Sequence, residues 1–486
     1  MAAVSSLGIG SGLDLNTLLA GLKTAEQAPL GAIQAQQTSY TSKLSAYGQL
    51  NSALSALQTA AAALAKPALF EGVKVSSTAT DVVTATALST AASGSYALNV
   101  TQLTQAQSLA TAGVASTTSA IGGGTATTVT LDFGTLSGGT LDPATGKYTG
   151  ATFTADTTRT AASVTIDASN NTLAGIRDAI NGSASIGVTA SIVNDGSATP
   201  NRLVLTSKQS GETSSMRIAV AGDAALSGLL ANDPAGTPAA QLQQTVTAQN
   251  TKLTVNGIAI TSATNSVAGA IQDVTLTVAT VGASTLSVQK DTDNAGNAIA
   301  TFVNAYNSLQ SVATKLTAFN ATSKSGAVLL GDSTLRNIQV RIRSALTTAQ
   351  TPDGSGLATL SQIGIGFQKD GTLSFDATKL RTVLDSQMSG VSNLFSGSAG
   401  VGGYGTQLSS LITGMTDSNG TLTAATKGIN TTLDSLGKQY TATSARIEAT
   451  VARYKAQFTQ LDMLISSMNQ TSSYLTQQFD SLNSKK

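Results

Sequence analysis

The sequence contains no cysteine, no histidine and no tryptophan. Without cysteine, the chain forms no disulfide bond and offers no thiolate as a nucleophile or metal ligand. Without histidine, it lacks the commonest general base and metal ligand, and a Ser-His-Asp triad is excluded. Carboxylate pairs and Ser-Lys arrangements remain, but no SxxK motif sits beside other catalytic signatures. We therefore expect a protein that is not an enzyme and has no catalytic residue, cofactor or metal.

Charge is also scarce. Charged residues make up 11% of the 486 residues, whereas soluble proteins have roughly 25%. The 27 basic and 26 acidic residues nearly cancel, so the balance indicates neither a nucleic acid nor an anionic membrane as partner. Aromatic residues make up 4% and provide few platforms for stacking sugars or bases. Hydrophobic residues still reach 41%, and the length predicts about three domains.

The amino-terminal segment does not have the pattern of a cleavable secretory signal peptide. It has no basic region, and Gly8, Gly10 and Gly12 interrupt any apolar run. No apolar run elsewhere reaches the ~18 residues that a membrane-spanning helix needs. We expect no membrane insertion, and a chain that is either cytoplasmic or exported by a route that leaves its amino terminus uncleaved.

Both ends of the chain have the apolar spacing of long helices. Near the amino terminus, Pro29 predicts a break between two helices, and Pro67 predicts the end of the second. From Ile429 to Leu482 the apolar positions alternate steps of three and four residues, which is a heptad-like seam. One extra four-residue step, from Ile447 to Val451, has the form of a stutter.

The middle of the chain has the pattern of short β-strands. Its β-branched residues occupy alternate positions in runs bounded by Gly, Asn and Asp. Residues 111–157 are poor in charge and rich in Gly and Thr, and they form either a flexible outer loop or part of a β domain. The predicted strands cover residues 73–75, 82–87, 96–100, 127–133, 163–166, 188–193, 202–206, 253–260 and 274–281.

Helical spacing returns after about residue 294. The predicted elements are a helix over 297–316, a helix capped by Asp332 or Ser333, a hairpin over 363–375 that turns at Asp370-Gly371, and a helix capped by Asp376 that ends near Met388.

These patterns predict an α+β multidomain protein. The two ends of the chain form a helical stem, and the middle of the chain forms β-rich head domains inserted between them. The apolar seam of the stem is exposed unless a partner covers it, so we expect the ends to be disordered in a monomer and to order on assembly. The predicted parts are a terminal coiled-coil leg (1–45 plus 440–486), a mainly helical domain (46–72 plus 293–439), a β-rich head domain (73–108 plus 245–292) and an outer β-rich head domain (109–244).

Two short motifs resemble ligand-binding loops, but each lacks required residues. The glycines of GIGSG at residues 8–12 have neither the preceding strand nor the spacing of a dinucleotide fingerprint. The run DTDNAG at residues 291–296 begins like an EF-hand loop, but Ala295 and Phe302 occupy two ligand positions. We interpret both segments as helix starts.

Several motifs occur in the same order as in one known family. Residues 5–14, SSLGIGSGLD, form a Gly-rich opening that leads into a helix. Residues 172–181, TLAGIRDAIN, and the two strands that follow to residue 207 resemble the flagellar hook IN motif. FVNAYN at 302–307 and LGDSTLR at 330–336 are similar to the family's FVxxYN and LxGDxxLR segments. Together these motifs resemble the flagellar filament cap family, also called hook-associated protein 2.

This resemblance implies a structural protein at the distal tip of the bacterial flagellar filament. The family is exported unfolded through the flagellum's own type III channel and forms a homo-oligomeric ring, commonly a pentamer. The ring retains exported flagellin and promotes its folding and insertion into the growing filament. The implied partners are further copies of the chain, flagellin, a flagellar export chaperone and, in some settings, host mucin or a cell surface.

If the terminal helices form the legs of such a ring, their apolar positions make the contacts with other subunits. The predicted contact residues are Leu15, Leu18, Leu22, Phe458, Leu461, Ile465, Met468 and Leu475. Two alternatives stay open from the sequence. One is a hook–filament junction protein with the same helical ends, and the other is a surface adhesin that uses the β head domains.

Overall fold

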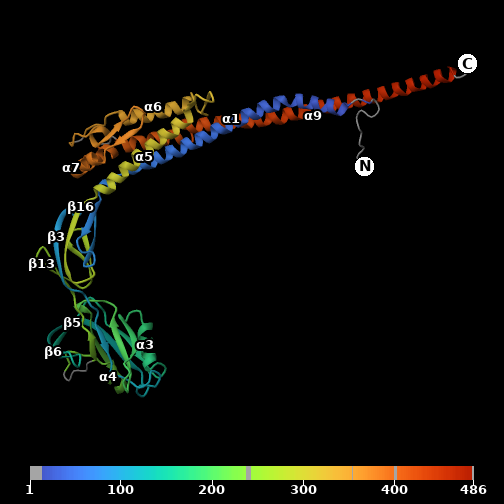
Figure 1. Cartoon of the computed structure of the whole chain (residues 1–486). Helices are drawn as coiled ribbons and strands as arrows, with labels where there is room; N and C mark the ends of the chain where they lie inside the picture. The colour runs from blue at the N-terminus through green and yellow to red at the C-terminus, as the bar shows by residue number, and fades with distance from the viewer. Residues whose placement is uncertain (1–11, 13, 237–241, 353, 399–401, 484–486) are drawn as a thin grey trace. The chain divides into compact units, whose positions relative to one another are not determined.

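The computed structural model describes residues 12, 14–236, 242–352, 354–398 and 402–483. The chain divides into two compact units, which are coloured along the sequence in Figure 1. The helical unit combines Met1–Phe70 with Thr292–Lys486, and the head unit consists of Glu71–Asp291. The head unit is therefore inserted into the helical unit as a single stretch of sequence.

The helical unit is built from long helices whose starts match the capping residues of the sequence. Asp332 caps α6 by accepting a hydrogen bond from the Leu335 amide, and Asp376 caps α7 by accepting one from the Lys379 amide, as predicted. The helices are α1 (Leu15–Leu64), α2 (Ala68–Glu71), α5 (Thr292–Thr317), α6 (Ser333–Thr347), α7 (Ala377–Ser396), α8 (Tyr404–Thr416) and α9 (Thr421–Asn483). Short hairpins join some of them: β17 (Phe319–Asn320) with β18 (Ser325–Gly326), and β19 (Ile365–Phe367) with β20 (Leu373–Phe375).

One hydrophobic core holds these helices together. It extends along α1 from Ala46 to Leu64 and takes in buried residues of α5, α6, α7, α8 and the start of α9. Phe395 lies at its centre, stacked on Phe70 at 6.4 Å and edge-on to Phe302 at 6.1 Å between ring centroids. Such aromatic pairs add to the gain from apolar burial.

The predicted break at Pro29 is wrong, because α1 runs through this residue without interruption. Proline fixes φ near the helical value, so the backbone angle itself is not the problem. Its cost inside a helix has two sources: it cannot donate a hydrogen bond to the carbonyl four residues earlier, here that of Ala25, and its ring crowds this carbonyl. Both Ala25 and Pro29 are exposed, so water can solvate that carbonyl. The helix ends at Leu64, close to Pro67 as predicted.

The head unit contains two hydrophobic cores, and we name its two parts after their architecture. The sandwich lobe packs a five-stranded sheet of order β1-β16-β3-β12-β13 against a three-stranded sheet of order β14-β15-β2. Every strand pair in it is antiparallel. Its strands are β1 (Val73–Ser77), β2 (Val83–Ala87), β3 (Gly94–Gln102), β12 (Thr251–Val255), β13 (Ile258–Ser262), β14 (Ser266–Ile271), β15 (Val274–Val278) and β16 (Gly282–Lys290).

The mixed lobe combines two four-stranded sheets with two short helices around the second core. The predicted hook IN segment has the expected form, because α3 (Leu173–Gly182) is followed by the hairpin of β8 (Val188–Asn194) and β9 (Asn201–Ser207). The other elements are β4 (Ser108–Ala110), β5 (Thr127–Asp142), β6 (Lys147–Ala155), β7 (Ala162–Ile166), β10 (Ser215–Ala221), α4 (Ala224–Leu230) and β11 (Gln243–Val246).

In the head unit one expectation is wrong and one open alternative is decided. Residues 253–260 are not one strand but the hairpin of β12 and β13, which turns at Asn256-Gly257 with φ of +50° and +83°. Such a pair favours a tight two-residue turn. Residues 111–157 contain the long antiparallel hairpin of β5 and β6, so this segment belongs to a β domain rather than to an outer loop.

Candidate assembly surface on the terminal helices

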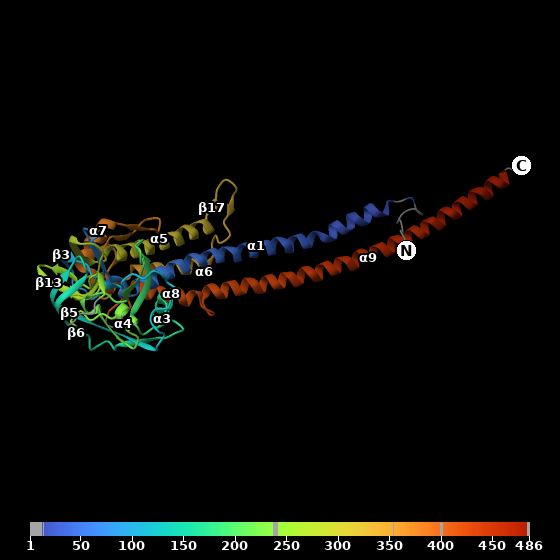
Figure 2. The same ribbon diagram turned by 90° about the horizontal axis from the view of Figure 1, so that it is seen from below.

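The two terminal helices pack along each other within the helical unit. Asp14 caps α1 by accepting a hydrogen bond from the Thr17 amide at 3.0 Å, and α9 continues for 63 residues without a break. Figures 1 and 2 show α1 and α9 side by side, with the first turn of α1 lying along the carboxyl-terminal part of α9. The side chain of Gln34 donates a hydrogen bond to the Tyr440 hydroxyl at 3.2 Å and ties the two helices together.

The final part of α9 extends beyond the start of α1. Since the helices are antiparallel and in step at Gln34 and Tyr440, the first residue of α1, Leu15, lies opposite about residue 459 of α9. The roughly 24 residues that follow span about 36 Å at 1.5 Å per residue. Figure 2 shows this projecting end of α9.

An apolar face of α9 loses its cover at this point. Ile447 is buried at 4% exposure, whereas Leu461, Met468 and Leu475 are 40%, 63% and 49% exposed. These residues and Tyr454 follow one another at seven-residue steps, so they lie on the same face of the helix. We call the exposed residues of this face the α9 stripe: Leu461, Leu464, Met468, Leu475 and Phe479.

The structure distributes the eight predicted contact residues between covered and uncovered positions. Leu15 is buried at 4% exposure and has almost no surface left for a partner. Leu22 and Phe458 are half-buried along the α1–α9 pair, and Ile465, just beyond the start of α1, is half-buried too. Leu18, Leu461, Met468 and Leu475 are exposed. The predicted list omitted Leu464 and Phe479, although Phe479 continues the heptad-like spacing that identified its neighbours.

A buried hydroxyl group connects α1 to the rest of the helical unit. The Tyr47 hydroxyl donates a hydrogen bond to Oδ2 of Asp332 at 2.7 Å, while Oδ1 of the same carboxylate caps α6. Burial of the ring, followed by this hydrogen bond, raises the pKa of Tyr47 to about 12. The ring stays neutral at physiological pH and anchors α6 against the base of the terminal pair.

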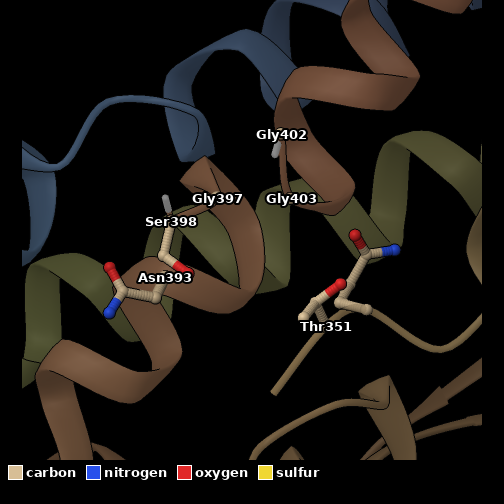
Figure 3. Close-up of a pocket in the computed structure, with 7 residues that line it drawn as sticks. Thr351, Asn393, Gly397, Ser398, Gly402 and Gly403 are labelled. Atoms are coloured by element: carbon tan, nitrogen blue, oxygen red, sulfur yellow. The ribbon is translucent and has the colours of Figure 1, made fainter. Parts of the chain in front are cut away.

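A small pocket in the helical unit is too narrow for a ligand. It lies between the end of α7 and the start of α8, and Figure 3 shows Asn393, Ser398 and the backbone of Gly402 around it. Its volume of about 10 Å³ corresponds to a single water molecule. Within the described ranges, no group of three or more acidic residues could hold a metal ion, and no helix is long and apolar enough to cross a membrane.

Comparison with known proteins identifies the family. The model of the flagellar hook-associated protein 2 N-terminus matches residues 11–107, and that of its C-terminus matches residues 248–470. Flagellar hook-associated protein 2 of Escherichia coli K12 is 41% identical over 496 residues, covering 100% of both chains. The chain belongs to the flagellar hook-associated protein 2 family. The Salmonella typhimurium member is 40% identical over 99% of this chain, and the A-type member of Pseudomonas aeruginosa is 33% identical over 98%.

A solved structure of the flagellar hook-associated protein 2 family shows the same fold. The flagellar cap protein FliD D1-D2-D3 domains from Escherichia coli match with a TM-score of 0.60 and 36% identity. The match covers 79% of this chain and 99% of that chain. It confirms the predicted α+β multidomain class and the resemblance to the filament cap family.

Proposed function

We propose that this chain is a subunit of the cap at the distal, extracellular tip of the bacterial flagellar filament. Its membership in the hook-associated protein 2 family and its similarity to a solved flagellar cap protein support this role. The subunits form a homo-oligomeric ring of five copies, which retains exported flagellin and promotes its insertion into the filament. A flagellar export chaperone binds the chain before export. The role is structural and involves no catalysis.

The α9 stripe is the observation that carries this proposal. It continues the apolar face that α1 covers, but it lies beyond the start of α1 at Leu15, so the chain alone leaves it in water. Burying one such side chain is worth roughly 1.5–3 kcal/mol. A ring repeats this gain once per subunit, so assembly can supply what the isolated helix pair lacks.

The contact residues of the leg follow from this geometry. Leu18 on α1 and the α9 stripe face the neighbouring subunits or the filament, while Leu22, Phe458 and Ile465 contribute their exposed edges. Leu15 acts within the chain, where it packs the start of α1. The expected disorder of the ends in a free monomer stays a prediction for the chain in solution.

The four-part division of the chain is part of the same proposal. In the helical unit, the main core starts at Ala46 and ends at Ile429, which supports a leg of residues 1–45 and 440–486 separate from a helical domain of 46–72 and 293–439. In the head unit, the two cores support the same kind of division, since their members lie in residues 82–100 with 253–288 and in residues 109–242.

A comparison of two faces of α9 tests the role of the stripe. Replacing Met468, Leu475 and Phe479 with serine removes apolar surface from the stripe. Met463 and Tyr474 are matched controls, because they are 61% and 60% exposed but lie on a different face of the helix. We expect the stripe variant to secrete unpolymerised flagellin and to make few filaments, and the control variant to behave like the wild type.

Deleting Gln470–Lys486 should give the same loss and leave the head unit folded, as judged by circular dichroism. Filaments of normal length and number from the stripe variant would contradict the proposal. Mass photometry of the purified protein would count the copies, and any number other than five would correct the stoichiometry without affecting the capping role.

A further inference from the structure

The methionines of this chain fall into two groups that differ sharply in exposure. Five of the six lie in the described part of the chain. The buried group has an exposure of 2% or less and consists of Met216, Met388 and Met415. The other two, Met463 and Met468, lie on α9 and are 61% and 63% exposed. Because an oxidant reaches accessible sulfur atoms first, these two are the candidates for oxidation.

The sequence lacks the side chains that compete most strongly for an oxidant, since it has no cysteine and no tryptophan. Oxidation of methionine adds one oxygen atom to the sulfur and gives a sulfoxide. This turns a flexible apolar side chain into a polar one and disrupts the apolar contacts that it makes. The effect on the protein therefore depends on whether the methionine belongs to an apolar surface.

The two exposed methionines have different surroundings on α9. A helical side chain leans toward the amino terminus, over the residues three and four positions earlier. Met468 therefore lies over Leu464 and Ile465, and it belongs to the α9 stripe. The corresponding neighbours of Met463, before and after it along the helix, are all polar: Thr459, Gln460, Ser466 and Ser467. Five residues at about 100° each place the two methionines about 140° apart around the helix.

We propose that Met468 is an oxidation site whose modification switches off the α9 stripe. Hydrogen peroxide is the oxidant: the sulfur lone pair attacks one peroxide oxygen, and the S–O bond forms as the O–O bond breaks. The departing hydroxide takes up the proton and leaves as water, so the sulfur loses two electrons and the peroxide gains them. The reaction occurs on the free chain, before a partner covers the stripe. This inference rests on the proposed capping function, because it assigns a regulation to the same surface.

The sulfoxide weakens assembly because its S–O group loses hydrogen bonds to water when the stripe is covered. Losing the gain from one buried apolar side chain lowers an association constant by about tenfold or more. A ring repeats this loss once per subunit. The same modification at Met463 leaves the stripe unchanged, so the two methionines form a natural matched pair.

Peptide mapping of the full-length chain tests where oxidation occurs. The purified protein is treated with hydrogen peroxide, quenched with catalase and analysed by fragment-ion mass spectrometry. We expect Met463 and Met468 to gain one oxygen atom at similar rates, roughly tenfold faster than Met216, Met388 and Met415. A rate for Met468 no higher than that of the buried methionines would overturn the proposal.

Leucine variants test the consequence in cells that regrow sheared filaments. Met468→Leu and Met463→Leu keep the apolar volume but take up no oxygen. Each strain is compared with itself with and without hydrogen peroxide, at a dose that oxidises Met468 in the chain recovered from the wild type. We expect peroxide to raise the unpolymerised flagellin in the medium for the wild type and Met463→Leu, but not for Met468→Leu. An equal rise in all three strains, or no rise in the wild type, would contradict the switch.

Glutamine variants separate this inference from the proposed function. Met468→Gln carries a polar side chain of similar length without any oxidant, and we expect it to release unpolymerised flagellin, whereas Met463→Gln should not. If Met468→Gln makes normal filaments while the serine variant of the stripe does not, the switch is wrong and the capping role stands. If both make normal filaments, the role of the stripe in capping fails as well.

Discussion

Replacing Gly405 with alanine should destabilise the helical unit, although this change in a helix ordinarily stabilises it. Alanine is favoured over glycine in a helix interior by about 1 kcal/mol. A Cβ atom on Gly405, in α8, would lie 2.7 Å from the Ala61 carbonyl oxygen of α1 and 2.9 Å from the amide nitrogen of Ala65, the residue that caps the end of α1. It would also lie 3.1 Å from the Phe395 carbonyl oxygen of α7. These are all backbone atoms, so none can move aside by changing a rotamer.

The magnitude follows from the balance of the two effects. Forcing extra atoms into a packed core costs typically about 1–3 kcal/mol, and the helical preference returns at most about 1 kcal/mol. We expect a net loss of about 1–2 kcal/mol. For a unit of this size, Tm should fall by about 2–4 °C per kcal/mol. Gly428 in α9 is the control, because no atom lies within 4 Å of its Cβ position, and its alanine variant should gain about 0.4–1 kcal/mol.

Differential scanning calorimetry separates these outcomes. The two compact units need not unfold in one transition, so the transition of the head unit serves as an internal reference that neither variant should change. We expect opposite shifts of the helical-unit transition in the two variants. A rise in Tm for Gly405→Ala of the size seen for Gly428→Ala would refute the close contact between α8 and α1.

Two further changes test hydrogen bonds of the two units. Tyr47→Phe should lower the free energy of unfolding of the helical unit by about 1–3 kcal/mol, because it removes a buried hydrogen bond to the Asp332 carboxylate; an unchanged urea midpoint would contradict this. The amides of Gly123 and Ala225 donate to Asp223 and hold its pKa below the ordinary 3.8. Its contribution to the head unit is therefore present above pH 3.8 and lost as the pH falls through the lower, folded-state pKa. Acid unfolding of Asp223→Asn should depend less steeply on pH, and an equal slope would exclude this role.

The sequence predicted those elements whose signal is local and strong. The apolar steps of three and four from Ile429 to Leu482 predicted most of α9. Asp332 and Asp376 predicted two helix starts, because caps act within one turn. The break predicted at Pro29 was wrong. The cost of a proline inside a helix depends on whether water can solvate the carbonyl that loses its hydrogen bond, and the spacing of residues does not reveal this. The β6 strand was missed because its Gly- and Thr-rich residues alternate little in polarity.

The candidate surface was predictable only in part. The heptad-like steps selected Leu461, Met468 and Leu475 correctly as one face of α9. They did not show that Leu15 is buried, because this depends on where α1 begins relative to α9. The ion pair of Asp132 and Arg217 on the mixed lobe left no local signal, because these residues are far apart in sequence and meet only through the pairing of β5 with β10.

The pairing of β1 with β16 has a consequence for how the chain folds. Val73 lies opposite Lys290, and the Asp291 amide donates a hydrogen bond to the Gly72 carbonyl at 2.9 Å. A folded head unit therefore holds its own first and last residues together. Closing a flexible loop of about 220 residues, rather than a few, would cost about 3–4 kcal/mol more in entropy. If the head unit folds first, it removes most of this cost, and α1 and α5 (Thr292–Thr317) can then meet as though joined by a short connection.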